Sequence, residues 1–277
     1  MIDISQLKAY YIHPAHENNV AFDKNVLKEY LELLVLEYLS TTPYAPKLAF
    51  IGGTNLRLVR GINRFSEDLD FDIHNLSEAE FIKMTDGIAS FLRAQGLPVE
   101  IRDRANPRLT AYRRSLYFPS LLYDLGLTGH KEERFLLKIE AQDQKVEYQP
   151  EFVDIRRNGF FFPILSPTQD ILLSMKLSAL LNRAKGRDFY DILFLWGLGA
   201  EPDYNFLKEK CGIDNNESLT QSLNKLLAET DLDVKHRDFS HLIFNPQDAA
   251  NIKLFPRFIS DLTLSKKNKR EDVTPNP

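Results

Sequence analysis

The spacing of apolar residues predicts helices and short strands in the first part of the chain. Apolar side chains recur at helical spacing over residues 24–39, and Leu48–Ile51 is a short apolar run typical of a buried strand. Residues 75–95 are expected to form a second helix, because Ser77 and Glu80 have capping-box spacing. Residues 97–102 have a strand-like pattern, and residues 116–142 are expected to hold two more strands.

The pattern changes near residue 163, where strand-like alternation gives way to long helical periodicity. Ser166 followed by Pro167 is typical of a helix start, with serine as the N-cap and proline at the first helical position. We therefore expect two domains, residues 1–163 and residues 164–277. The tail, residues 265–277, is charged and ends in prolines, which predicts disorder.

Two glycines follow the first predicted strand. Gly52 and Gly53 lie between this strand and a short helical run that starts at Thr54 and ends at Gly61. Main-chain N–H groups at such a junction can face an anion, and glycine lets the backbone approach a ligand closely. The simpler interpretation of a glycine pair is a turn. The position before a helix favours a phosphate-binding loop.

Three aspartates alternate with apolar residues in the next strand-like segment. A strand over residues 68–73 would place Asp68, Asp70 and Asp72 on one face. Carboxylates this close repel one another unless water or a cation screens them, and Mg²⁺ is a hard cation that prefers oxygen ligands. A solvated strand face is the simpler explanation of the aspartates alone. Their position after the glycine pair favours a site for a metal and a nucleotide.

These residues closely resemble the signature of the AbiEii-type nucleotidyltransferases of type IV toxin–antitoxin systems. The matching segments read Gly-Gly-Thr-x-Leu-Arg and Arg-x-Ser-x-Asp-Leu-Asp-Phe. The resemblance implies an α/β (α+β) fold, in which a DNA-polymerase-β-like lobe with a mixed sheet precedes a helical C-terminal lobe that closes over a cleft. It also implies nucleotide-binding roles for the residues that match the signature and, in the second lobe, for Lys176: Gly52, Gly53, Thr54, Arg57, Ser66 and Lys176.

The resemblance resumes in the second predicted domain. A Lys-x-x-Ala-Leu segment begins at Lys176, and Arg187-Asp188-x-Tyr190-Asp191 follows, with Ile192 where the family has leucine. The family's lysine is taken to contact nucleotide phosphate and its first aspartate to support catalysis, which implies these roles for Lys176 and Asp188. From the residues alone, Lys176 could simply extend to solvent, whereas burial would require an anion nearby.

Two further features suggest ligand contacts. Glu140, on a predicted neighbouring strand, is where the resemblance places a third metal-binding carboxylate, although an ordinary surface glutamate fits equally well. Residues 93–114 are rich in arginine with tyrosines nearby, a combination suited to RNA phosphates and stacked bases. A solvated surface paired with acids is the alternative. The candidate RNA-binding residues are Arg102, Arg104, Arg108, Arg113 and Arg114.

Composition narrows the class of protein. The chain has 277 residues and a formal charge of −4, so any contact with a polyanion must come from a local patch. The single cysteine, Cys211, excludes an internal disulfide and a cysteine-rich zinc site and suits a reducing compartment. The N-terminal sequence lacks the features of a signal peptide, and no apolar stretch reaches membrane length. We expect a soluble cytoplasmic protein.

The expected reaction transfers a nucleotidyl group from an NTP to a hydroxyl and releases pyrophosphate. Asp68 and Asp70 would hold two Mg²⁺ ions, and Lys176 would neutralise developing negative charge. The resemblance implies an RNA acceptor, with the 3′ end of tRNA as the candidate, and a cognate antitoxin. One alternative is a nucleotidyltransferase that modifies a protein or a small molecule. The other is an inactive fold that serves as a binding module, which intact Gly-Gly and Asp-x-Asp motifs disfavour.

Overall fold

The computed structural model describes residues 2–11, 19–103 and 111–271. The chain divides into two compact units. The first unit comprises Met1–Gly61, Phe65–Lys145 and Pro150–Ser166. The second comprises Ile62–Arg64, Val146–Gln149 and Pro167–Pro277. The main break therefore falls between Ser166 and Pro167, and two short segments that precede it in the chain belong to the second unit.

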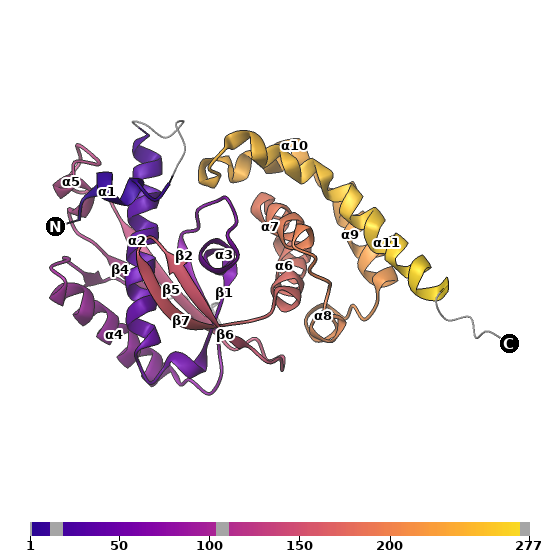
Figure 1. The fold of residues 1–277 in the computed structure, drawn as a ribbon, viewed down its shortest axis with the longest axis horizontal. Helices are drawn as coiled ribbons and strands as arrows, with labels where there is room; N and C mark the ends of the chain where they lie inside the picture. The colour runs from indigo at the N-terminus through magenta and orange to yellow at the C-terminus, as the bar shows by residue number, and fades with distance from the viewer. Residues whose placement is uncertain (1, 12–18, 104–110, 272–277) are drawn as a thin grey trace. The chain divides into compact units, whose positions relative to one another are not determined.

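A five-stranded sheet forms the centre of the first unit (Figure 1). The strand order is β1-β2-β5-β4-β3, with β2 and β5 parallel and the other pairs antiparallel, which confirms the expected mixed sheet. The strands are β1 (Leu48–Ile51), β2 (Asp68–Ile73), β3 (Glu100–Ile101), β4 (Tyr112–Tyr117) and β5 (Leu136–Gln142). A separate hairpin consists of β6 (Glu151–Arg157) and β7 (Phe160–Ser166), and β7 packs against β1.

Helices cover the apolar face of this sheet. The long helix α2 (Val20–Ser40) packs against α4 (Glu78–Ala94), and both contribute to the core that buries Leu69 and Phe71 of β2. The predicted capping box at α4 is present, because Ser77 and Glu80 bond each other's main chain. Two shorter helices are α1 (Ile4–Lys8) and α5 (Leu121–Asp124). Apolar side chains on alternate strand positions therefore fix which face of the sheet stays polar.

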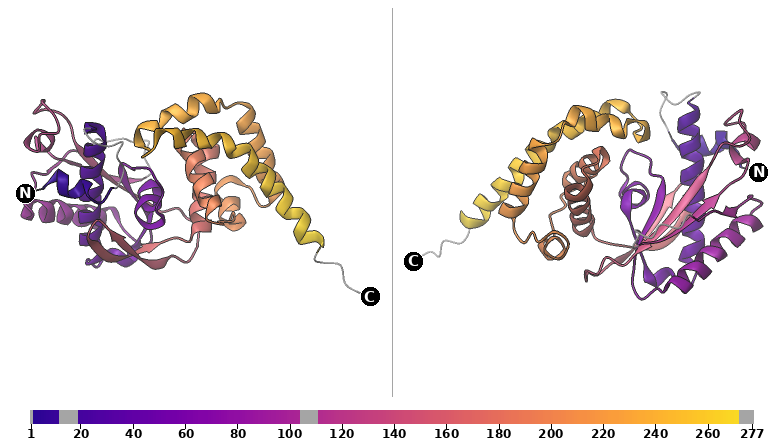
Figure 2. Two further views of the ribbon diagram at one scale, coloured as in Figure 1. Left: turned by 45° about the horizontal axis from the view of Figure 1, so that its top comes forward. Right: turned by 180° about the vertical axis from the view of Figure 1, so that it is seen from behind.

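A short helix follows β1 and packs on β2. Helix α3 (Gly52–Asn55) continues into a π-helical turn, η3 (Leu56–Arg60), which ends at Gly61 with a left-handed φ of 87°. A 3₁₀ turn, η2 (Ala45–Lys47), precedes β1. In Figures 1 and 2, α3 lies on the side of the sheet away from α2. The polar face of β2 therefore meets α3.

The second unit is helical. Helix α6 (Gln169–Arg183) packs against both α7 (Gly186–Gly197) and α8 (Tyr204–Cys211), and α9 (Asn216–Ala228) lies beside α11 (Phe255–Glu271) (Figure 2). Shorter turns connect them: α10 (Leu232–Lys235), η4 (His236–Asp238), η5 (Ser240–Leu242) and η6 (Pro246–Leu254). Helix α11 extends into the segment for which charge predicted disorder. Within the described ranges, no helix combines the length and apolarity needed to cross a membrane.

Helix α6 starts later than its sequence suggests. The prediction placed the N-cap at Ser166, but the N-cap is Thr168, whose side chain accepts a hydrogen bond from the Ile171 amide. Ser166 is the last residue of β7 and is fully buried, and its hydroxyl accepts a hydrogen bond from the Asn55 amide at 2.9 Å. The hairpin and a buried polar partner thus take the residue that local sequence assigns to a cap.

Candidate active site

The alternating aspartates lie on β2 as predicted from their spacing. Leu69, Phe71 and Ile73 point into the core, so the three aspartates occupy the polar face. Asp68 and Asp70 are partly exposed, whereas Asp72 is fully buried and accepts a hydrogen bond from the main-chain N–H of Gln144 at 2.8 Å. Asp68 and Asp70 are therefore placed to meet a ligand, and Asp72 instead holds the chain that leaves β5.

The first glycine of the pair lies directly against one of these carboxylates. Gly52 has a left-handed φ of 78°, and a Cβ added there would lie closer than 3.0 Å to Oδ2 of Asp70. Only glycine combines this backbone conformation with so close an approach. The main chain at the start of α3 and the Asp70 carboxylate consequently share one small space.

Buried hydrogen bonds fix α3 to the sheet. The Thr54 hydroxyl donates to the main-chain carbonyl of Asp68 at 2.5 Å, and the side-chain amide of Asn55 donates to the main-chain carbonyl of Phe50 at 2.6 Å. Thr54 is fully buried, so this hydrogen bond ties α3 to the start of β2, where Asp68 lies. The Thr54 hydroxyl is therefore engaged with β2, and the nucleotide contact expected of Thr54 stays a prediction.

Strand β5 extends the polar face beyond the aspartates. The register pairs Asp68 with Lys138 and Asp70 with Glu140. Lys138 Nζ lies 3.3 Å from an Asp68 oxygen. Glu140 is thus next to Asp70, where a third metal ligand was expected, but its carboxylate forms a 2.8 Å ion pair with Arg113 of β4. Glu140 would have to exchange this partner to bind a metal.

The donor set suits Mg²⁺. Among the residues that the structure describes, no group of three or more histidine, cysteine, aspartate or glutamate side chains is arranged to hold a metal ion. Mg²⁺ usually keeps several waters and binds one or two carboxylates together with substrate phosphates. Asp68 and Asp70 supply hard oxygen donors on one face, and the Gly52 main chain leaves room beside Asp70 that a Cβ would fill. These residues fit an ion completed by nucleotide phosphate.

Two other predicted nucleotide contacts lie elsewhere. The Arg57 guanidinium bonds both carboxylate oxygens of Glu29 on α2, at 2.7 and 3.2 Å, and the Arg57 side chain is only 6 % exposed. Arg57 thus ties η3 to α2, and the nucleotide contact expected of it stays a prediction. Ser66 is half-buried just before β2.

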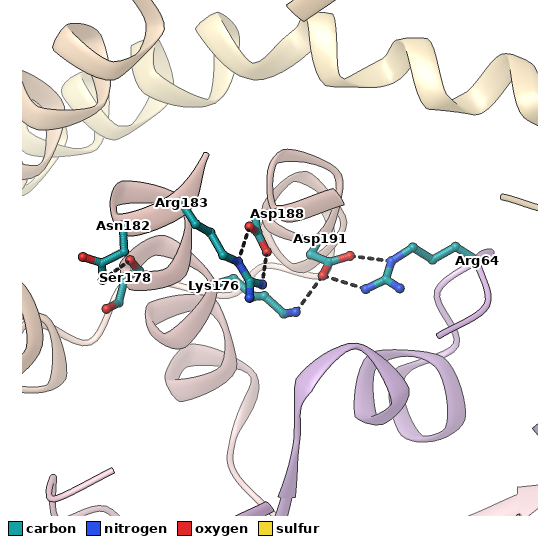
Figure 3. Close-up of polar contacts among 7 residues, drawn as sticks. All are labelled: Arg64, Lys176, Ser178, Asn182, Arg183, Asp188 and Asp191. Carbon is teal, nitrogen blue, oxygen red and sulfur yellow. Dashed lines mark hydrogen bonds and ion pairs between the residues drawn. The ribbon is translucent and has the colours of Figure 1, made fainter. Parts of the chain in front are cut away.

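The second unit contains a buried cluster around Asp191, which Figure 3 shows. The Arg64 guanidinium donates to both oxygens of Asp191 at 2.7 Å, and Lys176 Nζ lies 2.8 Å from one of them. All three residues are buried. Burial raises the pKa of the Asp191 carboxyl, but the Arg64 and Lys176 cations outweigh burial and lower the pKa below its ordinary value.

Lys176 and Asp188 belong to different ion pairs. The Arg183 guanidinium donates to both oxygens of Asp188, at 2.9 and 2.7 Å, and the Asp188 side chain is fully buried (Figure 3). The anion that a buried Lys176 requires is therefore Asp191. Sequence reasoning matched Asp191 to the family signature without giving it a role and did not identify Arg64. The only available signal was that both residues lie in the signature segments.

Two of the predicted RNA-binding arginines, Arg113 and Arg114, lie on opposite faces of β4. Arg113 shares the polar face with Glu140, whereas Arg114 points to the opposite face and pairs with Asp86 of α4 at 3.1 Å. Arg102, just after β3, stacks on the Tyr117 ring. Arg104 and Arg108 lie outside the described residues. Among the described arginines, Arg113 and Arg114 therefore lie on opposite faces of β4, and RNA binding by these residues stays a prediction.

Comparisons with known proteins agree with this architecture. A family model described as "Nucleotidyl transferase AbiEii toxin, Type IV TA system" matches residues 34–262. The fold is similar to MenT4, a nucleotidyltransferase toxin from Mycobacterium tuberculosis H37Rv, with 17 % identity, a TM-score of 0.61, and coverage of 95 % of this chain and 90 % of that chain. It is also similar to JHP933 from Helicobacter pylori, with 20 % identity, a TM-score of 0.51, and coverage of 89 % and 97 %. No curated protein matches.

Proposed function

This chain belongs to the AbiEii family of nucleotidyltransferase toxins of type IV toxin–antitoxin systems, and we propose that it transfers a nucleotidyl group from an NTP to the 3′ end of tRNA in a Mg²⁺-dependent reaction. The observation that supports this proposal is that the Asp70 carboxylate occupies the space that a Cβ at Gly52 would fill. It brings the proposed phosphate site next to the proposed metal site within one unit.

The carboxylates and the α3 main chain have complementary roles in this proposal. Asp68 and Asp70 would hold Mg²⁺, and the main chain at Gly52 and Gly53 would face the β- and γ-phosphates. When bound, Mg²⁺ makes the acceptor hydroxyl easier to deprotonate and neutralises charge on the departing pyrophosphate. Thr54 keeps β2 and α3 in register through its bond to the Asp68 carbonyl.

The chemistry is a single displacement at the α-phosphorus. The acceptor oxygen forms a bond to phosphorus, the bond to the pyrophosphate oxygen breaks, and the hydroxyl proton is released. Catalysis of such a step rests on positioning and on electrostatic stabilisation. We propose that Lys176 supplies a cation to the nucleotide phosphates. Asp188 would support catalysis indirectly, by holding Arg183 in place. The Lys176–Asp191 pair is compatible with this role, because Asp191 keeps Arg64 as a partner if Lys176 turns to phosphate.

An RNA acceptor is supported by cationic side chains on the polar face of the sheet. Arg113 lies one strand beyond Glu140, and Arg102 lies at the edge near β4. Membership in a toxin–antitoxin family also implies a cognate antitoxin.

The test is a transfer assay. The protein is incubated with Mg²⁺, total RNA and each of the four labelled NTPs in turn. We expect label in small RNA, release of pyrophosphate, and loss of both on chelation of Mg²⁺. Label in protein with none in RNA would overturn the proposal that the acceptor is RNA. Transfer undiminished by chelation would overturn the proposal that the reaction depends on Mg²⁺. An absence of label from every acceptor would overturn the proposed reaction.

A further inference from the structure

A cationic cavity lies on the polar face of the sheet, beside the aspartates. Its volume is about 260 Å³, slightly below the roughly 300–1,000 Å³ of typical small-molecule sites. The space suits one phosphate-bearing group more than a whole drug-sized ligand. Its polar and charged lining residues are Arg102, Arg113, Ser115, Tyr117, Arg134 and Lys138. We call this cavity the β4–β5 pocket.

The pocket carries more positive than negative charge. Arg102 pairs with Glu100, Arg113 with Glu140 and Lys138 with Asp68. Arg134 forms no ion pair with any residue that the structure describes. The pair between Arg102 and Glu100 is about half exposed on both sides, so it holds the guanidinium only weakly. Among the described residues, one cation of the pocket is therefore without a paired carboxylate, and a second can exchange its carboxylate for another anion.

The guanidinium of Arg102 is also held in a defined position. Its central carbon lies 3.7 Å from the centroid of the Tyr117 ring. Tyr117 is buried, so its ring forms a fixed floor under Arg102. A planar guanidinium can bond a phosphate through two N–H groups and offers a flat surface on which a base can stack.

The strand order places the pocket on one side of the aspartates and α3 on the other. Going across the sheet, α3 packs on β2, the aspartates lie on β2, and the pocket is built on β5 and β4. In phosphoryl transfer the attacking and leaving oxygens lie roughly in line on opposite sides of phosphorus. If pyrophosphate leaves over the Gly52 main chain, the acceptor hydroxyl must arrive from the β5 side.

We propose that the β4–β5 pocket binds a backbone phosphate of the acceptor RNA strand, next to the hydroxyl that attacks. This assignment rests on the proposed function, because it takes the direction of attack from the nucleotide site. It adds Arg134, Lys138 and the Arg102–Tyr117 stack to acceptor binding and removes Arg114, which lies on the other face. The NTP phosphates do not use this pocket.

The test replaces the two pocket arginines that are least involved in the fold. Arg102→Ala and Arg134→Ala are compared with wild type and with Arg156→Ala, in which the lost arginine is on β6 and its side chain is 72 % exposed. Each variant loses one positive charge from the same unit. The probe is a labelled single-stranded oligoribonucleotide with a 3′ hydroxyl, and its affinity is measured at several salt concentrations. The KM for the NTP is measured in parallel.

We expect each pocket variant to bind the RNA roughly tenfold more weakly and to flatten the slope of log affinity against log salt by about 0.7. Arg156→Ala should retain the wild-type slope, and every variant should retain the wild-type KM for the NTP. Unchanged RNA affinity in both pocket variants would overturn the assignment of this pocket to acceptor RNA. An equal loss of affinity in Arg156→Ala, or a raised KM for the NTP in a pocket variant, would overturn it as well. Failure of the proposed function is a separate result, namely wild type that transfers no label to RNA.

Discussion

Carboxylates occur in both units of this protein, but the two units surround them differently. In the first unit, Asp68 is 28 % exposed on a sheet face, and the cation nearest to it, Lys138, is itself 41 % exposed. In the second, Asp188 and Asp191 are fully buried, and an arginine bonds both oxygens of each. Asp68 is thus held loosely near solvent, whereas Asp188 and Asp191 are held tightly in the interior of the second unit.

This difference separates carboxylates that can bind a ligand from those that hold the fold. A buried carboxylate is stable only when hydrogen bonds and cations compensate its lost hydration, so its oxygens are already occupied. A carboxylate on a partly exposed face keeps water around it and can exchange that water for a cation. This contrast is the reason why we propose metal binding for Asp68 and Asp70, and a positioning role for Asp191. Five predictions test this division, from the largest expected effect to the smallest.

The largest effect is expected from neutralising the aspartates of β2. Asp68→Asn and Asp70→Asn should each reduce nucleotidyl transfer at least about 1,000-fold, which corresponds to about 4 kcal/mol in activation free energy. Their melting temperatures should change little, because both side chains are partly exposed and Lys138, the cation nearest to Asp68, is itself 41 % exposed. Steady-state kinetics and thermal melting check this. Variants that transfer at nearly the wild-type rate would show that these carboxylates bind no essential metal.

The opposite behaviour is expected from Asp191. Asp191→Asn should lower the free energy of unfolding by about 3 kcal/mol, because it leaves two buried cations facing a neutral amide. Asp188→Asn should cost less, since its partner Arg183 is 41 % exposed and can turn to water. Urea denaturation of the three proteins measures both losses. If Asp191→Asn were as stable as wild type, the buried cluster would not support the second unit.

Lys176 tests whether a buried residue of the second unit also acts in catalysis. Lys176→Met should reduce kcat about 100-fold, the scale for losing one electrostatic stabiliser of a transition state. Methionine fills similar space, and Asp191 keeps Arg64, so stability should fall less than in Asp191→Asn. Transfer kinetics and urea denaturation separate the two effects. A fully active variant would restrict Lys176 to being a counterion.

Gly52 tests the close approach on which the nucleotide site depends. Gly52→Ala should lower the free energy of unfolding by about 1–2 kcal/mol through its left-handed φ alone, and should further displace Asp70 and impair transfer. Gly96→Ala is a matched control, because Gly96 has a φ of 80° with no atom within 4 Å of an added Cβ. Melting and transfer assays on both variants isolate the contact. Equal transfer rates in the two variants would contradict the claim that transfer depends on the close approach of Gly52 and Asp70.

The smallest effect is expected in the pH dependence of stability. Burial, and then the nearby Glu29 carboxylate, raise the pKa of Glu32 on α2 well above its ordinary value. The unfolded chain releases this proton near pH 4.3, so the folded state loses stability as pH rises from there towards the raised pKa. The pKa of Asp191 is lowered, so its effect on stability has the opposite sign. The stability that the ionised Asp191 contributes is lost as pH falls below about 3.9.

Urea denaturation from pH 4 to pH 8 checks this sign. Glu32→Gln should be more stable than wild type at pH 7, and the difference should shrink towards pH 4. A difference that grows on acidification would mean that Glu32 is ionised and compensated in the folded state.

Local sequence patterns predicted the parts of the site that depend on one strand or one turn. Alternation on β2 placed the aspartates opposite Leu69 and Phe71, and a glycine pair marked the turn beside them. Alternation would also have separated Arg113 from Arg114 had β4 been predicted to start at Tyr112. The true strand begins earlier than the apolar residues suggested, because Tyr112 packs against Phe81 of α4.

The parts that local patterns missed depend on contacts between distant segments. Arg57 is buried because Glu29 lies opposite it on α2, and Lys176 meets Asp191 because α6 packs against α7. Arg64 joins them from a three-residue segment that belongs to the second unit. Nothing in the spacing of residues along one element encodes such pairs. A buried arginine or lysine predicts only that an anion is near, and the fold decides which one.

The central claim is that the β2 aspartates bind a metal–nucleotide complex, and ligand-dependent melting tests it most directly. Wild type and Asp70→Asn are melted with Mg²⁺ and an NTP analogue whose α,β-bridge is carbon, and again with the analogue alone. At about 100 times its Kd the complex should stabilise wild type by about 2.7 kcal/mol, raising the melting temperature by roughly 5–10 °C, and Mg²⁺ should be required. Asp70→Asn should show no such rise. An equal rise in both proteins, or a rise without Mg²⁺, would contradict the claim.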